Sequence, residues 1–271
     1  MTVRPSCPAV VTAAGHGTRF RPFTQYVPKE MLPIGTQPAV GHVITECLAA
    51  GADLVYVVTR PGDPIVPAYV ADLRQQGMPV QAIPENLDHG YGNAAPLLTL
   101  AEQLAGCEVF MVAFGDDVLL GHPAGSDLSA MLTLATSGAD AVIAAQLIDH
   151  EQIASFGVVE VTEPGGDRVS RIRQRPDPAT VREPLAVVSR LVLRPAILRH
   201  LIPRPEASGE VDLGLAVGDQ AAVTDVRVRR LTAHWVTVGD PRRYADALAH
   251  HLHGHEPTPQ GLIGARTART T

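Results

Sequence analysis

The sequence predicts an α/β protein with a large, mostly parallel β-sheet and helices on both faces. Two observations lead to this fold class. Short valine-rich apolar runs alternate with amphipathic stretches through the first half of the chain, as they do in βαβ units. Glycines and charged residues directly follow two of these runs. Parallel sheets bind ligands beyond the carboxyl ends of their strands, so this rim is the expected site.

The first half of the chain supplies the expected parallel sheet. Its strands are expected at the apolar runs 9–13, 54–59, 80–83, 109–114 and 141–147. The helices between them are expected at the amphipathic stretches 39–50, 67–76, 94–104 and 128–137. Because no internal repeat or linker interrupts this alternation, we expect one core over about residues 8–150.

The second half changes in character and predicts a small, mixed β lobe. Strands are expected at 158–161, 169–173, 185–193 and 226–231, between Pro- and Gly-rich turns, and a helix at 241–251. We therefore expect one domain over residues 1–254, in which a lobe over about 151–254 covers the rim. Residues 255–271 are rich in Pro, Gly, Thr and Arg, and we expect them to form a flexible tail.

Composition argues against several classes of protein. Of the 271 residues, 45% are hydrophobic, which is enough for a full core. A net charge of −6 and the absence of a basic run argue against nucleic acid as a partner. The apolar runs are of strand length and the N-terminus lacks a signal-peptide pattern, so no membrane partner is expected. Three scattered cysteines indicate reduced thiols and a cytoplasmic location.

The chain contains one lysine, Lys29, against twenty-one arginines. Because arginine supplies the surface cations of this chain, Lys29 is expected to have a role that arginine cannot fill. Its ammonium is a compact point charge that can bind a phosphate oxygen. Upstream, residues 15–19 (GHGTR) follow an apolar run and bring glycine amides and an arginine. Together these features predict a polyphosphate site. It is neither a complete GxGxxG, because Phe20 replaces the third glycine, nor a P-loop.

Residues 13–24 and 28–33 (PKEMLP) resemble the signature of sugar-1-phosphate nucleotidyltransferases, most closely the UTP-glucose-1-phosphate uridylyltransferase family. The similarity continues at 90–94 (GYGNA), 115–117 (GDD), 156–158 (FGV) and 185–188 (LAVV), and so covers roughly residues 8–250. It implies a Rossmann-like fold of the nucleotide-diphospho-sugar transferase type. The implied enzyme joins a nucleoside triphosphate to a sugar-1-phosphate or a sugar-like cyclitol phosphate and releases pyrophosphate, commonly as a homodimer or homotetramer. The alternative is a catalytically weakened nucleotide-sugar-binding protein with a regulatory role.

The resemblance also implies roles for individual residues. Arg19, Lys29 and Asp116 are expected to be catalytic, and Asp116 to hold Mg²⁺, which prefers one or two carboxylates plus phosphate oxygens. The residues expected to bind the nucleotide are Ala13, Ala14, Gly15, Gly17, Thr18, Glu85, Gly90 and Gly92. Those expected to bind the acceptor are Asp117, Gly157, Gln174, Arg175 and Glu210.

One departure from the family pattern concerns the metal. Relatives usually place a second aspartate in a W/H-x-D-x-G motif, whereas residues 235–239 read WVTVG. Thr237 at that place carries no charge. Either Mg²⁺ is held by Asp116, phosphates and water, or Asp240 reaches in, or activity is reduced.

Further departures lie on the acceptor side and in the base pocket. Gln174-Arg175-Pro176 replaces Glu-Lys-Pro, Pro184 replaces an asparagine, Ser189 a glycine, and residues 212–216 (DLGLA) replace QLTDA. Several changes on one wall indicate a different acceptor. Glu85 stands where relatives that use uridine or thymidine nucleotides carry glutamine. A carboxylate only accepts hydrogen bonds, which suits the N1–H and N2–H donors of guanine, so UTP and GTP both remain candidates, with cytosine a lesser possibility.

Overall fold

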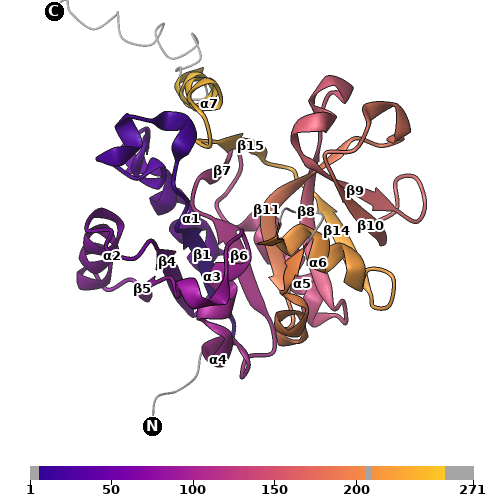
Figure 1. The fold of residues 1–271 in the computed structure, drawn as a ribbon, viewed down its shortest axis with the longest axis horizontal. Coiled ribbons are helices and arrows are strands. Elements are labelled where there is room, and N and C mark those ends of the chain that lie inside the picture. Colours follow the sequence, from indigo (N-terminus) through magenta and orange to yellow (C-terminus); the bar gives the residue numbers. More distant parts are fainter. Residues whose placement is uncertain (1–5, 205–208, 254–271) are drawn as a thin grey trace, which may run out of the picture.

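The computed structural model describes residues 6–204 and 209–253, and a nine-stranded sheet is its central feature (Figure 1). The strands are β1 (Pro8–Ala13), β4 (Leu54–Thr59), β5 (Val80–Pro84), β6 (Phe110–Phe114), β8 (Ala141–Leu147), β9 (Gly157–Val161), β10 (Val169–Gln174), β11 (Leu185–Leu193) and β14 (Val226–Arg230). They are ordered β10-β9-β11-β6-β1-β4-β5, with β8 paired to β11 and β14 paired to β8.

Most of these strands run in one direction. Strands β5, β4, β1 and β6 are parallel neighbours, and β14 is parallel to β8. Strand β11 is antiparallel to β6, β8 and β9, and β10 is antiparallel to β9. Within the described residues, only β10 and β11 therefore run against the rest of this sheet. The predicted fold class, a mostly parallel sheet with helices, is confirmed.

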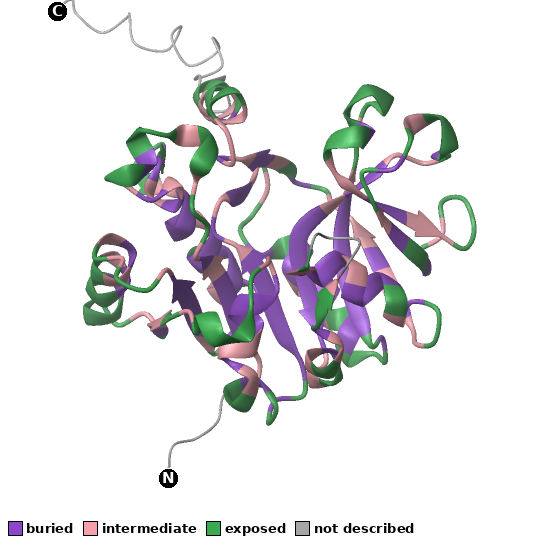
Figure 2. Ribbon diagram, viewed as in Figure 1, coloured by how far each residue is buried: buried purple, intermediate pink, exposed green. Residues whose placement is uncertain are grey.

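Helices cover both faces of the sheet. They are α1 (Ala39–Ala49), α2 (Ile65–Gln75), α3 (Ala95–Thr99), α4 (Ala101–Leu104), α5 (Ser126–Thr136), α6 (Leu213–Gln220) and α7 (Pro241–His253). Because side chains alternate along a strand, Val11 packs in a core cluster with α1, α2 and α5, whereas Val10 packs in a second cluster with α3, α4 and α6. Figure 2 shows the strands buried between exposed outer turns.

Three small antiparallel sheets and several single turns complete the fold. The sheets pair β2 (Pro33–Ile34) with β3 (Gln37–Pro38), β7 (Asp117–Leu120) with β15 (His234–Thr237), and β12 (Pro203–Arg204) with β13 (Glu210–Val211). The 3-10 helices are η1 (Thr18–Phe20), η2 (Phe23–Gln25), η3 (Lys29–Met31), η4 (Leu87–His89), η5 (His150–Ser155), η6 (Pro178–Thr180) and η7 (Pro195–His200).

The structure differs from the sequence expectation in three places. The helix expected at 94–104 is interrupted at Leu100 and forms α3 and α4. Helix α6 was not predicted, because its eight residues include two glycines and give a weak helical signal. The strands of the second half extend the central sheet, since β11 pairs directly with β6. The expected tail, residues 255–271, lies outside the described residues.

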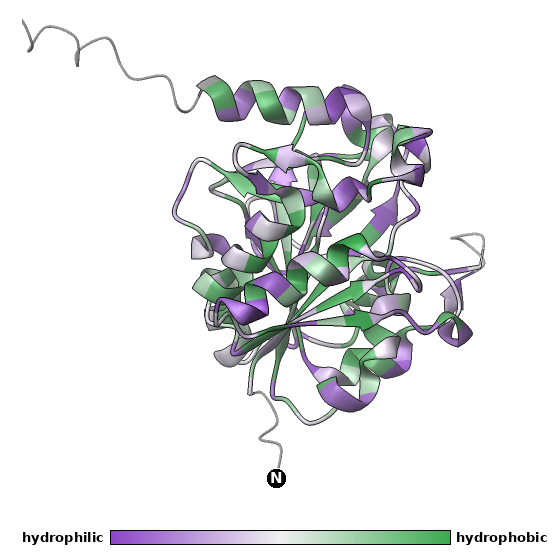
Figure 3. Cartoon of the chain, turned by 90° about the vertical axis from the view of Figure 1, so that its left-hand side faces the viewer, coloured by the Kyte–Doolittle hydropathy of each residue, from purple (hydrophilic) through white to green (hydrophobic). Residues whose placement is uncertain are grey.

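Helix α7 connects the end of the described chain to its beginning. It lies over β15 in Figure 1 and contacts both β15 and β2. The Tyr244 hydroxyl donates to the Pro33 carbonyl at 2.9 Å, and its ring meets that of Phe20 edge-on at 6.3 Å. Figure 3 shows hydrophobic and hydrophilic turns alternating along α7. Among the described helices, none is long and apolar enough to cross a membrane.

Candidate active site

Two adjoining cavities open at the carboxyl ends of the parallel strands. The larger, of about 750 Å³, is lined by eleven of the predicted site residues: Ala14, Gly15, Gly17, Thr18, Arg19, Lys29, Glu85, Gly90, Gly92, Asp116 and Glu210. The smaller, of about 280 Å³, is lined by four: Asp117, Gly157, Gln174 and Arg175. Asn93 and Phe114 line both, so the cavities are neighbours. We call them the nucleotide cavity and the acceptor cavity.

Two predicted residues lie elsewhere than expected. Glu210 was expected at the acceptor but lines the nucleotide cavity, because β13 lies beside the glycine segment at 90–92. Ala13 ends β1 with 1% of its surface exposed and packs in the core, so it does not line either cavity.

The sheet itself brings together the glycine loop, residues 15–19, and the aspartate pair, Asp116 and Asp117. Strands β1 and β6 are parallel neighbours, and the Gly115 amide donates to the Thr12 carbonyl at 2.8 Å. Gly17 adopts φ 60°, and a Cβ there would lie 2.8 Å from the Thr24 side chain, whose hydroxyl donates to the Gly17 carbonyl at 2.7 Å. A glycine is therefore required at this turn. The loop is fixed over the end of β6.

Lys29 lies in the nucleotide cavity between two carboxylates. Its ammonium is paired with Asp116 and lies 3.4 Å from Glu30 Oε1. Burial opposes the charged form, but Asp116 and Glu30 outweigh it, so the pKa of Lys29 lies above its usual value. A Cβ on Gly15 would lie 3.2 Å from Lys29 Cε, which places the lysine directly beside the glycine loop. The cavity therefore holds a permanent cation at its floor.

Glu30 is a site residue that sequence reasoning missed. It lines the nucleotide cavity with 1% of its surface exposed, and burial raises the pKa of its carboxyl despite Lys29. Its Oε2 is buried and has no hydrogen-bond partner in the described part of the chain. The available signal was the acidic residue that directly follows the single lysine.

Asp116 is the one predicted metal ligand on this rim. The Thr237 hydroxyl donates to the Asp116 carbonyl at 3.3 Å and accepts from the Gly239 amide at 3.1 Å. Asp240 directly precedes α7 and accepts from the Arg243 amide at 3.0 Å, and its carboxylate does not line the cavity. Nowhere in residues 6–204 or 209–253 do three His, Cys, Asp or Glu side chains form a ready metal cluster. The donor set thus fits Mg²⁺ held by Asp116 together with phosphates and water.

Two of the departures from the family pattern touch each other: Gln174, which lines the acceptor cavity, contacts Asp212, which does not. Gln174 Nε2 donates to Asp212 Oδ1 at 3.2 Å, and Asp212 also accepts from Asn93 Nδ2 at 3.2 Å and from the Leu215 amide at 2.8 Å. The family that the sequence resembles carries a carboxylate at position 174 and an amide at position 212. Here the two groups are exchanged, and the contact joins an amide to a carboxylate.

A second pair of contacts lies at the floor of this cavity. The Ser189 hydroxyl donates to the buried Asp117 carboxylate. Burial and then the neighbouring Asp116 raise the pKa of Asp117. Arg190, fully buried, donates to the Asp117 carbonyl at 2.8 Å and to both Glu46 carboxylate oxygens at 2.9 and 2.7 Å. Arg190 is therefore a positioning residue for the aspartate pair, hidden from sequence reasoning inside a strand-like run.

Arg175 adopts an unusual backbone conformation at the cavity wall. Its φ is 45°, and its amide donates to the Phe156 carbonyl at 3.0 Å. Left-handed conformations cost free energy in residues other than glycine, and they gather at functional sites. This turn places Arg175 in the lining of the acceptor cavity.

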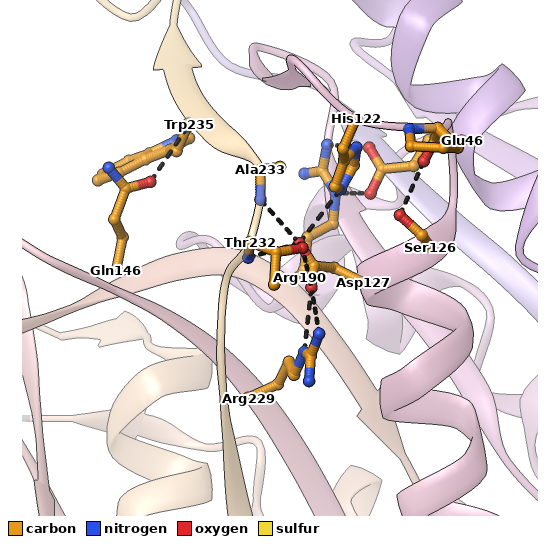
Figure 4. Close-up of polar contacts among 11 residues, drawn as sticks. Glu46, His122, Ser126, Asp127, Gln146, Arg190, Arg229, Thr232, Ala233 and Trp235 are labelled. Carbon is orange, nitrogen blue, oxygen red and sulfur yellow. Dashed lines mark hydrogen bonds and ion pairs between the residues drawn. The ribbon is translucent and has the colours of Figure 1, made fainter. Parts of the chain in front are cut away.

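Strand β15, which carries Thr237, is anchored by a buried aspartate (Figure 4). Asp127 accepts from the Thr232 amide at 2.9 Å, the Ala233 amide at 3.1 Å and the Arg229 guanidinium at 2.9 Å. Burial opposes its charge, but these donors hold the pKa of Asp127 below its usual value. The Trp235 amide donates to Gln146 Oε1 at 3.1 Å. These contacts fix the start of β15.

Known proteins resemble this chain in sequence and in fold. Residues 8–253 match the family model described as nucleotidyl transferase. The UTP-glucose-1-phosphate uridylyltransferase 2 of Staphylococcus saprophyticus is 27% identical over 77% of this chain and 79% of its own length. The uridylyltransferase of Bacillus subtilis is 27% identical, over 77% of this chain and 78% of its own.

Solved structures show the same fold. A UDP-glucose pyrophosphorylase complexed with UDP-glucose aligns with a TM-score of 0.80 and 24% identity, covering 92% of this chain and 99% of its own. The UTP-bound UGPase from Acinetobacter baumannii aligns with a TM-score of 0.79 and 22% identity, covering 94% and 96%. None of these relatives supports the regulatory alternative. The match over residues 8–253, together with the paired Lys29 and Asp116, shows that the chain belongs to the nucleotidyl transferase family.

Proposed function

We propose that the chain transfers the nucleotidyl group of a nucleoside triphosphate to a sugar-1-phosphate or a sugar-like cyclitol phosphate. The products are the nucleotide-diphospho-sugar, or its cyclitol counterpart, and pyrophosphate. The observation that carries this proposal is the protonated Lys29, held against Asp116 beside the glycine loop, in a cavity that adjoins a second one. The names of the uridylyltransferase relatives support the same reaction type.

The reaction needs alignment and charge neutralisation. An oxygen of the acceptor phosphate attacks the α-phosphorus and forms a P–O bond, while the bond from that phosphorus to the oxygen that bridges the α- and β-phosphates breaks. Both reactants are anions, so fixed positive charge favours their approach and the charge that builds in the transition state. Lys29 is proposed to face the α-phosphate, and Arg19 with the amides of residues 15–18 to hold the triphosphate.

Mg²⁺ is proposed as the cofactor. When bound, it neutralises phosphate charge, and Asp116 together with phosphate oxygens would hold it. The carboxylate of Asp116 remains in place through its contact with Lys29 and through the fixed turn that Arg190 supports.

Glu85 is proposed to select the base and to favour GTP over UTP. It lines the nucleotide cavity, is half-buried, and burial raises the pKa of its carboxyl. Its side chain has no hydrogen-bond partner among residues 6–204 and 209–253. Its two acceptors are therefore free for the adjacent N1–H and N2–H donors of guanine, and would repel the O4 of uracil.

The assembly and location of the protein are proposed from the family that the sequence resembles. We propose a homodimer or homotetramer in the cytoplasm, with the triphosphate and the phosphorylated acceptor as its small-molecule partners.

A pyrophosphate-release assay tests the proposed reaction. GTP, UTP, CTP, ATP and dTTP are each combined with glucose 1-phosphate and with a set of other sugar and cyclitol 1-phosphates, in the presence of Mg²⁺. The proposal predicts release that depends on both substrates. If triphosphates bind but no pair yields pyrophosphate, the chain is a binding protein and the proposed reaction is wrong.

A further inference from the structure

A third cavity adjoins the acceptor cavity and has no role in the reaction described above. It has a volume of about 440 Å³. Four residues line both cavities: Phe156, Trp235, Thr237 and Arg243. Because the two spaces share this wall, a ligand that fills the acceptor cavity can continue into the third one. We call it the extension cavity.

The wall shared by the two cavities is aromatic and rigid. The rings of Phe156 and Trp235 meet edge to face with centroids 5.2 Å apart, and the Arg243 guanidinium lies 4.5 Å above the Phe156 ring. Such contacts fix the ring orientations. The Trp235 indole N–H is buried and has no hydrogen-bond partner in the described part of the chain. Because this N–H is not exposed to the cavity, Trp235 presents its apolar ring to a ligand there and not a hydrogen-bond donor.

Half of the eight remaining lining residues carry carboxylates or amides, and the two carboxylates, Asp149 and Asp246, are exposed. Asp149 and Asp246 line the cavity, and neither carboxylate has a partner within the residues that the structure describes. Gln146 and Gln152 add amides that both donate and accept. A bound cation would need acceptors alone, and a bound anion donors alone. A mixture of both around an aromatic pair matches the hydroxyl groups of a polyol ring, which donate and accept.

We propose that the extension cavity binds a second polyhydroxylated ring linked to the first ring of the acceptor. The preferred acceptor is then a 1-phosphate of two joined rings, with the phosphorylated ring in the acceptor cavity. This inference rests on the proposed function, because it extends the acceptor of that reaction.

Tryptophan fluorescence tests the proposal directly. Trp235 is the only tryptophan in the 271 residues, so a change in tryptophan emission reports on this wall without turnover. The protein is titrated with glucose 1-phosphate and with glucose-based disaccharide 1-phosphates that differ only in linkage. At least one disaccharide 1-phosphate should bind roughly tenfold tighter than glucose 1-phosphate, since hydrogen bonds to charged groups contribute this much.

The matched variants are Asp149→Asn, Asp246→Asn and Glu151→Gln. Each removes one carboxylate charge with little change of shape, and Glu151 is exposed and does not line the extension cavity. Asp149→Asn and Asp246→Asn should each reduce the ratio of disaccharide to glucose 1-phosphate affinity several-fold, whereas Glu151→Gln should leave it unchanged.

The outcomes separate this inference from the proposed function. If glucose 1-phosphate is turned over but no disaccharide binds more tightly, or if Glu151→Gln changes the ratio as much as the other two, the extension site is wrong and the reaction stands. If no 1-phosphate releases pyrophosphate, the proposed function fails, whatever the fluorescence shows.

Discussion

The nucleotide and acceptor cavities differ in how far each keeps the family's pattern. The glycine loop, Lys29 and Asp116 retain it, and they meet around one half-buried ion pair. On the acceptor side, Gln174 and Ser189 depart from it, and each departure contacts another polar group, Asp212 and Asp117 respectively. The Lys29–Asp116 pair is thus retained, although Thr237 lacks the second carboxylate of relatives, and on the acceptor wall two departures, Gln174 and Asp212, contact each other. These two substitutions must be interpreted together.

The largest effect is expected at Lys29. Lys29→Ala removes the cation beside the glycine loop, and Lys29→Arg replaces the compact ammonium by a wider, planar guanidinium. Both should reduce kcat by about 100- to 1000-fold, because the charge faces the transition state. Steady-state pyrophosphate release measures the loss, and circular dichroism with thermal unfolding checks that the fold is intact. Turnover near that of the wild type in Lys29→Ala would remove this residue from the mechanism.

Asp116 gives the next largest effect. Asp116→Asn keeps the shape but loses the carboxylate charge that is proposed to hold Mg²⁺. Magnesium-dependent activity should disappear, because Thr237 carries no charge and Asp240, which bonds to the first turn of α7, does not line the cavity. The activity is titrated with MgCl₂ in both proteins. Superimposable titration curves would place the metal elsewhere.

Glu85 should change the choice of nucleotide more than the rate. If the carboxylate of Glu85 accepts hydrogen bonds from guanine, Glu85→Gln should shift the nucleotide preference from GTP towards UTP by roughly tenfold to a hundredfold. The values of kcat/KM for GTP and UTP are compared with one accepted 1-phosphate. Arg60→Gln is a useful control, because Arg60 lines a further cavity of about 530 Å³, which Glu85 also lines, but not the nucleotide cavity. A clear UTP optimum that Glu85→Gln does not alter would end the guanine proposal.

Local sequence patterns predicted most of the central sheet. The run at 54–59 and the run at 141–147 match β4 and β8 at both ends, because continuous valine-rich segments are typical of buried strands. Helix α6 escaped prediction because a tertiary contact helps to define it: Asp212 caps it while also bonding to the distant Gln174. Short, glycine-containing helices depend on such contacts.

The candidate site could be predicted as a set of residues but not as a set of contacts. The motif around Lys29 and the aspartate pair places both on one rim. The pairing of Glu46 with Arg190, 144 positions apart, leaves no local pattern, so the support beneath Asp117 could not be foreseen. The same is true of the unpaired oxygen of Glu30.

The central claim is that the exchanged pair on the acceptor wall governs the acceptor and not the nucleotide. It is tested most directly by KM values for an accepted 1-phosphate and for the triphosphate in Gln174→Glu, Asp212→Asn and the double variant. Gln174→Glu places two carboxylates about 3.2 Å apart and should raise the acceptor KM roughly tenfold. The double variant, which restores the family's carboxylate and amide positions, should recover most of this loss, with the triphosphate KM unchanged throughout. Additive effects in the double variant, or an equal rise in the triphosphate KM, would contradict the claim.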